Sequence, residues 1–226
     1  MLYAYAICQS EQPPKISGLK GATLQAIGDA PQGPWAVVSE HQEPPVAADP
    51  EDLWRHEAVV EAAMEDGAVL PMRVGTLFSD EAALIGALRA RQAEFRRALR
   101  RVDGAVELGV RAVLASGEHD LGNTRRDADT GSAGPGTTYL LSRLEHRRSG
   151  ERLALTIHAP LAALARAARW QLESGETQRL IAAYLVDRGR VEAFRARVGE
   201  LEEERETQIV CTGPWPPYSF ASEADR

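Results

Sequence analysis

Residues 106–114 read VELGVRAVL and form the clearest strand pattern in the chain. Successive side chains of a strand point to opposite faces, so an alternation of apolar and other residues predicts one buried face and one partly wet face. The positions expected on the buried face are Val106, Leu108, Val110, Ala112 and Leu114. The rest of the chain can be interpreted outward from this strand.

Three further strands are expected near the N-terminus. In LYAYAIC, bulky Tyr3, Tyr5 and Ile7 alternate with smaller neighbours, which indicates a strand period. The other two strands flank a turn rich in glycine and proline, as in a hairpin. They are expected at residues 22–27 and 34–40.

A helix is expected to begin at Asp49. The Asp49 carboxylate can accept from the free N–H groups of the first turn, and Pro50 fits the first helical position. Gly67 is placed to end this helix. Its core-facing residues are expected to be Leu53, Val60 and Met64.

The segment AVLPMRVGTLF, residues 68–78, reads as extended chain broken by Pro71 and Gly75. A helical region is then expected from Ser79 to about Val102, because large apolar residues recur there at helical spacing. This stripe comprises Leu84, Leu88, Phe95, Leu99 and Val102.

Beyond the central strand, residues 116–136 contain almost no large apolar side chain and are expected to form a flexible linker. A helix is expected from about Thr138, and a helical stretch beyond Pro160 is expected to align Leu161, Leu164, Ala168 and Leu172. The remaining elements are a buried strand at 180–186, a helix at 191–205 and a strand at 207–212.

Strands and helices thus mix on both sides of the linker, which predicts an α+β protein with mainly antiparallel sheet. The expected organisation is an N-terminal domain at 1–115, the linker at 116–136 and a C-terminal domain at 137–226. The last domain is expected to include a docked GPWPPYSF tail.

Charge and composition exclude several classes of function. The 26 Lys and Arg against 33 Asp and Glu give a net charge of −7, which argues against a nucleic-acid backbone as the main partner. Cys8 and Cys211 are expected to be free, inert thiols. With neither a secretory leader nor an apolar run long enough to span a membrane, the chain is expected to be soluble and cytoplasmic.

Motifs for catalysis or metal binding are incomplete. His56 and Glu57 begin like a zinc-protease helix, but the position four residues after His56 is Val60, so the second ligand is missing. Glu57 and Glu61 share a helix face that could bind a cation, although solvated hydrogen bonding is favoured. The glycine-rich stretch before Thr138 lacks both the calcium-loop glutamate and the P-loop lysine. No catalytic residue, cofactor or metal is therefore expected.

Arg73 and a cluster of arginines at residues 89–101 could each contact a partner. Arg73 lies between apolar residues and must either reach solvent or pair with a carboxylate, for which Glu57 and Glu107 are candidates. A structural ion pair is favoured over partner binding. Six arginines crowd into residues 89–101, where a solvated helix face is favoured over a site for acidic partners.

The sequence GPWPPYSF, residues 213–220, places aromatic residues among prolines. Pro214 and Pro217 match a P-x-x-P ligand, but that role would leave Trp215, Tyr218 and Phe220 exposed. We favour a strap that packs these aromatics on the fold, with the prolines lowering the entropy lost in fixing it.

Five motifs together resemble the gas vesicle protein F/L family. They are HEAVVEAAM, VLPMRVGTLF, DGAVELGV, AAYLV and GPWPPYSF, in the order and approximate spacing of that family, and the match runs from Leu2 to Phe220. The resemblance implies two domains, each a variant ferredoxin-like α+β sandwich. The modest 116–136 region and short tail distinguish the chain from longer relatives, and an F-type member is favoured over an L-type one.

The resemblance also implies a function without known enzymatic activity. Family members are accessory proteins of gas vesicle formation, present as minor structural components of the gas vesicle, that bind the hydrophobic shell protein A and other accessory proteins. A protein that covers the apolar surface of the shell subunit would prevent the subunit from aggregating before assembly. The expected contact set is Leu70, Met72, Arg73 and Phe78, and the expected structural motif residues are His56, Glu57, Trp215, Tyr218 and Phe220.

Two other interpretations remain open. An enzyme could use Arg73, His56 and Glu57 as polar groups, and their clustering around a concave pocket would favour it. An adaptor could dock elsewhere through GPWPPYSF, and ready proteolysis after Gly213 in the folded protein would favour that role.

Overall fold

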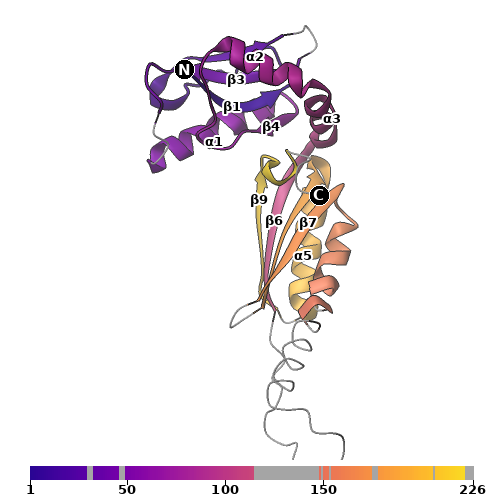
Figure 1. Ribbon diagram of the computed structural model, residues 1–226. Coiled ribbons are helices and arrows are strands. Elements are labelled where there is room, and N and C mark those ends of the chain that lie inside the picture. The colour runs from indigo at the N-terminus through magenta and orange to yellow at the C-terminus, as the bar shows by residue number, and fades with distance from the viewer. Residues whose placement is uncertain are drawn as a thin grey trace, which may run out of the picture. The chain divides into compact units, whose positions relative to one another are not determined.

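The strand predicted from VELGVRAVL lies within β6, Ala105–Leu114, in the computed structural model (Figure 1). Its alternation is confirmed, because Leu108, Val110 and Ala112 are buried. The structure describes residues 1–29, 33–45, 49–114, 148, 150–152, 154–174, 178–205 and 207–221. The linker expected at 116–136 and the helix start expected at Thr138 lie outside these residues.

The chain divides into two units of mixed helix and sheet, and β6 runs from the first into the second. Unit 1 combines Met1–Glu107 with Pro214–Arg226, and unit 2 spans Leu108–Gly213. The tail, grouped above with residues 137–226, therefore clusters with unit 1. Every strand pair with a described register is antiparallel, in agreement with the predicted α+β class.

Unit 1 contains a five-stranded sheet with the order β2-β3-β1-β4, in which β5 also pairs with β1. The strands are β1 (Leu2–Cys8), β2 (Leu24–Gly28), β3 (Trp35–Glu40), β4 (Val69–Pro71) and β5 (Leu77–Phe78). All seven residues of β1 are buried, so both faces of this central strand are covered.

The alternation expected in β1 is interrupted by a bulge. Its register with β3 shifts between Ala4 and Ala6, and Tyr5 is the extra residue. As a result Tyr3, Tyr5 and Ala6 join one core cluster, and Ile7 is left for the opposite face. The strand predicted from LYAYAIC is confirmed, but its regular alternation is interrupted, because a strict period of two cannot anticipate an inserted residue.

Helix α1, Pro50–Glu65, begins as predicted, with the Asp49 carboxylate accepting from the Glu51 N–H at 3.0 Å. Of its predicted core-facing residues, Val60 is buried and Met64 is partly buried against the core. Leu53 is exposed, whereas the buried positions are Asp52, His56, Val59, Val60 and Ala63. The buried face of α1 includes the polar residues Asp52 and His56, and a pattern of hydrophobic residues cannot identify polar positions as buried.

The helical region expected at 79–102 forms two helices, α2 (Glu81–Ala90) and α3 (Gln92–Val102). They meet at Arg91, whose backbone leaves the helical region. The predicted stripe of Leu84, Leu88, Phe95, Leu99 and Val102 is buried throughout, so the break preserves the apolar face. The Arg91 guanidinium lies 4.8 Å from the Phe95 ring centroid.

Unit 2 contains a four-stranded sheet with the order β7-β8-β6-β9. The strands that join β6 are β7 (Ala167–Ser174), β8 (Gln178–Asp187) and β9 (Ile209–Trp215). Helix α5, Val191–Arg205, follows β8 after the short helix η2, Arg188–Arg190, and a further helical stretch covers residues 154–162. Their common core includes Leu108, Val110, Ile157, Leu161, Tyr184, Phe194, Val198 and Leu201.

The helix expected to extend beyond Pro160 to Leu172 was wrong. Helical residues end at 162, and Ala168 and Leu172 lie in β7. Their spacing of four satisfies a strand period as well as a helical one, and the cross-strand pairing of Ala167–Ser174 with β8 outweighs the helix propensity of alanine.

Candidate partner-binding surface

The loop between β4 and β5, Met72–Thr76, lies in the middle of the VLPMRVGTLF segment that was predicted to contact a partner. The Thr76 backbone N–H donates to the Arg73 carbonyl at 3.1 Å, and the Thr76 hydroxyl donates to the same carbonyl at 2.6 Å. Gly75 has a φ of 83°, a conformation that favours glycine. The 72–76 loop is thus a tight, internally bonded turn.

A buried histidine from α1 holds this loop. The His56 Nε2 lies 3.1 Å from the Met72 carbonyl oxygen, which can only accept, so Nε2 carries the proton. Nδ1 then accepts from the Tyr3 hydroxyl at 2.9 Å, and the Tyr3 oxygen accepts from the Gly75 N–H at 3.1 Å. The HEAVVEAAM and VLPMRVGTLF motifs therefore meet through one hydrogen-bonded network.

This network requires a neutral imidazole. Burial lowers the pKa of His56 from its ordinary 6.5, and the Met72 carbonyl only partly opposes that shift. Burial likewise lowers the pKa of His41 and His158.

We expect the protein to lose stability as the pH falls below 6.5. There the unfolded state binds a proton at His56 that the folded state does not, until the pH reaches the lowered folded pKa. NMR titration of the His56 ring checks this expectation. A folded-state pKa at or above 6.5 would contradict it, and the fall in unfolding free energy from pH 7.5 to 5.5 should be smaller in His56→Gln than in the wild type.

The four proposed contact residues differ in their exposure. Arg73 is exposed at the turn, and Met72 and Phe78 are partly buried. Leu70 is only 2% exposed and belongs to the core, so its assignment to the contact set is corrected. Val74, which was not among the predicted contacts, is 37% exposed beside Arg73.

The ion pair predicted for Arg73 does not form with either suggested carboxylate. Glu57 instead accepts from the Tyr218 hydroxyl at 2.7 Å. Glu107 accepts from the Ser219 hydroxyl at 2.7 Å and from the Ser219 N–H at 2.8 Å. Both carboxylates therefore hold the tail.

The segment Pro214–Phe220, here called the strap, is fastened to unit 1 by these bonds and by burial. Its short helix η3, Tyr218–Phe220, places Phe220 in the interior, and Arg101 donates to the Phe220 carbonyl. Burial raises the pKa of Tyr218, and its bond to Glu57 raises it further. The expectation that all three aromatics pack was wrong for Trp215, which is 46% exposed.

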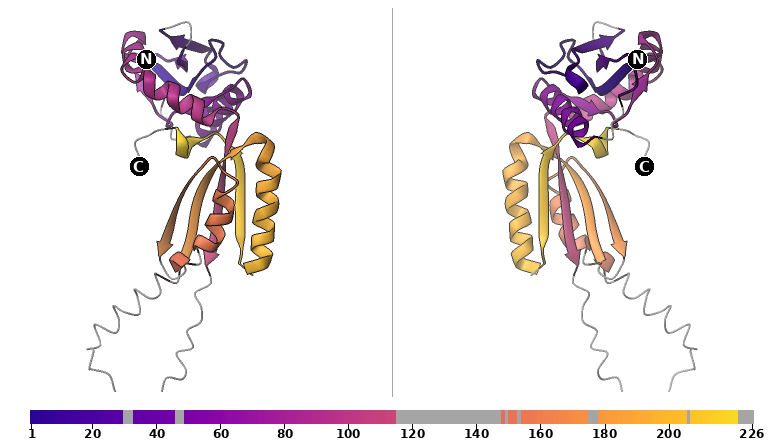
Figure 2. Two further views of the ribbon diagram at one scale, coloured as in Figure 1. Left: turned by 90° about the vertical axis from the view of Figure 1, so that its right-hand side faces the viewer. Right: turned by 90° about the vertical axis from the view of Figure 1, so that its left-hand side faces the viewer.

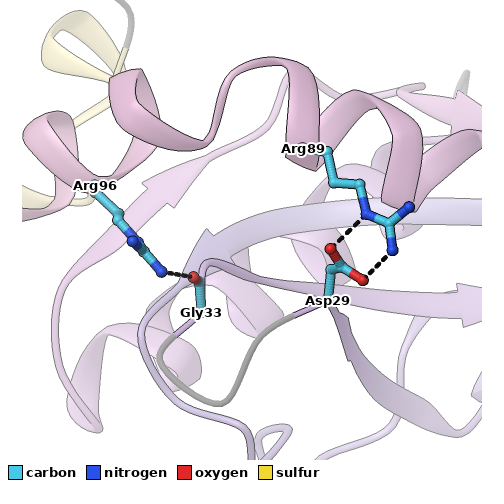
Figure 3. Close-up of polar contacts among 4 residues, drawn as sticks. All are labelled: Asp29, Gly33, Arg89 and Arg96. Carbon is cyan, nitrogen blue, oxygen red and sulfur yellow. Dashed lines mark hydrogen bonds and ion pairs between the residues drawn. The ribbon is translucent and has the colours of Figure 1, made fainter.

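The arginines of residues 89–101 are largely used within unit 1 (Figure 3). Arg89 binds both carboxylate oxygens of Asp29, and Arg96 donates to the Gly33 carbonyl at 2.9 Å. With Arg101 on the strap, three of these side chains join α2 and α3 to other segments. The sequence could not reveal this, because Asp29 and Gly33 are 60 and 63 residues away.

Two of the three polar groups of the rival enzyme interpretation have separate structural partners, and the third is exposed. Both His56 nitrogens are engaged, Glu57 holds the strap, and Arg73 faces solvent. In the described residues, no group of three or more His, Cys, Asp or Glu side chains could hold a metal ion. Burial raises the pKa of the Cys8 thiol to about 11, which disfavours a reactive thiolate.

Helix α1 also carries an exposed aromatic residue that was not predicted from the sequence. Trp54 on α1 is 74% exposed, next to the exposed Leu53. A tryptophan in a helix is expected in the core because it is large and apolar. Only the position of Trp54 outside the buried face of α1 could have indicated that it is exposed. Within the described parts of the chain, no helix is both long and apolar enough to cross a membrane.

Comparison with known proteins gives a consistent result. The family model "Gas vesicle synthesis protein GvpL/GvpF" matches residues 1–222. The chain is 32% identical to gas vesicle protein L of a Streptomyces strain, covering 95% of this chain and 85% of that protein. Gas vesicle protein F of the same strain is 29% identical, covering 96% of this chain and 98% of that protein.

Solved structures show the same fold. The crystal structure of GvpF from Anabaena sp. has a TM-score of 0.81 and 21% identity, covering 100% of this chain and 97% of that one. GvpF from Microcystis aeruginosa has a TM-score of 0.78 and 19% identity, with 98% of each chain covered. The relatives include both F and L proteins, and the chain belongs to the gas vesicle protein GvpL/GvpF family.

Proposed function

We propose that this protein is an accessory factor of gas vesicle assembly that binds the hydrophobic shell protein A and other accessory proteins in the cytoplasm. By covering the apolar surface of the shell subunit, it limits aggregation and aids nucleation of the vesicle. Membership in the GvpL/GvpF family carries the proposal.

The 72–76 loop is the proposed contact for shell protein A. Arg73 and Val74 are exposed on it, and Met72 and Phe78 lie partly exposed on either side. The His56 and Tyr3 bonds fix the loop, so little conformational entropy is lost when a partner binds. Val74 can contact an apolar surface of the partner, and Arg73 can pair with a carboxylate next to that surface.

Coexpression with tagged shell protein A tests the proposal. The variants Arg73→Ala and Val74→Asp are expected to lower the recovered soluble complex about tenfold or more, equivalent to about 1.4 kcal/mol. Arg100→Ala changes another exposed arginine of unit 1 and should leave recovery unchanged.

Three outcomes would contradict parts of the proposal. Absence of a complex with the intact protein would refute binding of shell protein A itself. Full recovery with both folded loop variants would remove the loop as the contact. Loss of complex only in Trp54→Ala would move the contact to α1, where a large exposed aromatic has the character of a binding hot spot.

A further inference from the structure

The sheet of unit 2 has one face packed and one face open among the described elements. Leu108, Val110 and Ala112 of β6 and Leu180 of β8 point into the common core with α5. Figure 1 shows α5 and the neighbouring helix on the same side of this sheet, and Figure 2 gives two further views of it. The alternate side chains of the strands therefore face away from those helices.

These alternate side chains are unusually apolar for a solvated sheet face. Val113 of β6 is 42% exposed and Val210 of β9 is 46% exposed, and Ile181 of β8 is half-buried. An open face of an antiparallel sheet normally carries polar residues. Three β-branched side chains from three adjacent strands instead line one groove together, and they are here called its apolar floor.

A groove of about 510 Å³ lies over this floor. Besides Val113, Ile181 and Val210, it is lined by Arg111, Arg179 and Glu173. This volume is within the range of pockets that accept several side chains or a small ligand. We name it the β6–β8–β9 groove.

The charge of the groove opposes that of the protein. The whole chain carries −7, whereas the groove presents two guanidinium groups and one carboxylate. Considering only the described residues, neither Arg111 nor Arg179 forms an ion pair. Both guanidinium groups border an apolar floor and can bind carboxylates bidentately.

We propose that the β6–β8–β9 groove is the docking site for an acidic amphipathic helix of a partner protein. Its apolar face lies on Val113, Ile181 and Val210, and its glutamate or aspartate residues pair with Arg111 and Arg179. Arg111 and Arg179 repel a basic helix at the same position, and these two cations outnumber the single carboxylate of Glu173. This inference goes beyond the proposed function, because the groove and the 72–76 loop belong to different units.

The test uses the full-length protein and a labelled synthetic helical peptide with leucine on one face and glutamate on the other. Fluorescence anisotropy at physiological salt is expected to show micromolar binding, weakened at least tenfold by Arg111→Glu with Arg179→Glu. Val113→Ser with Val210→Ser changes only exposed positions and is expected to weaken binding without unfolding. Arg100→Glu with Arg190→Glu changes two exposed arginines outside the groove and is the charge-matched control.

Several results would overturn the proposal. A peptide with lysine in place of glutamate that binds equally well would exclude charge recognition. Acidic-peptide binding that persists in both double variants would place the site elsewhere. A concentration-dependent dimer in sedimentation, lost in the Val113→Ser/Val210→Ser variant, would identify a second copy of this chain as the occupant. Capture of shell protein A is expected to persist in all groove variants, which separates this test from that of the 72–76 loop.

Discussion

Replacing His56 with alanine is expected to lower the free energy of unfolding of unit 1 by about 3 kcal/mol. The substitution removes a fully buried ring and leaves a cavity beside Tyr3 and Tyr5, whose rings lie 5.7 and 5.5 Å from its centroid. It also leaves the Tyr3 hydroxyl without its acceptor and the Met72 carbonyl without its donor. Hydrogen exchange of the β1 amides at pH 7.5 measures the loss in unit 1 directly.

A double-mutant cycle separates the network from simple packing. Tyr3→Phe keeps the ring but removes the hydroxyl that bonds His56 and Gly75, so a loss of about 1–2 kcal/mol is expected. Because the two residues share one network, the double variant should lose less than the sum of the single losses. Strictly additive losses would mean that His56 and Tyr3 act independently, contrary to the network described above.

The elements that were predicted correctly are those in which the spacing of apolar residues fits only a strand or only a helix. Leu108, Val110 and Ala112 alternate unambiguously, and α5 has Phe194, Val198 and Leu201 at helical spacing and buried. Ala168 and Leu172 fit both periods, and the choice between them depends on pairing with β8, which is a property of the folded chain.

The candidate surface was predicted less completely, for a related reason. The charge of Arg73 left exposure and an ion pair as alternatives, and the ion pair that was favoured is wrong. The partners of Glu57 and Glu107, however, come from a tail more than 100 residues away, and periodicity contains no information about such pairs. The β6–β8–β9 groove was also missed, because a valine at position 113 or 210 reads as an ordinary strand residue until the packed face is known.

A substitution at the end of the strap is expected to have the second large effect on stability, because this end is part of the core of unit 1. Phe220 is 2% exposed, and its truncation by Phe220→Ala is expected to cost about 3–4 kcal/mol of unit 1 stability. Trp215→Ala is the matched control in the same segment, since half of that side chain is already in water and about 1 kcal/mol is expected. Hydrogen exchange of the β1 and β4 amides is the readout.

The same variants distinguish a strap from an adaptor tail. β6 leaves unit 1 and β9 returns to it, so the bonds of Tyr218 and Ser219 to Glu57 and Glu107 fix the returning end of the chain. If these bonds hold the native state, proteases will cleave after Gly213 rapidly in Phe220→Ala and slowly in the wild type. Rapid removal of the segment from a wild-type protein whose β1 amides remain protected would instead show that unit 1 is stable without the strap, and would favour a tail free to dock elsewhere.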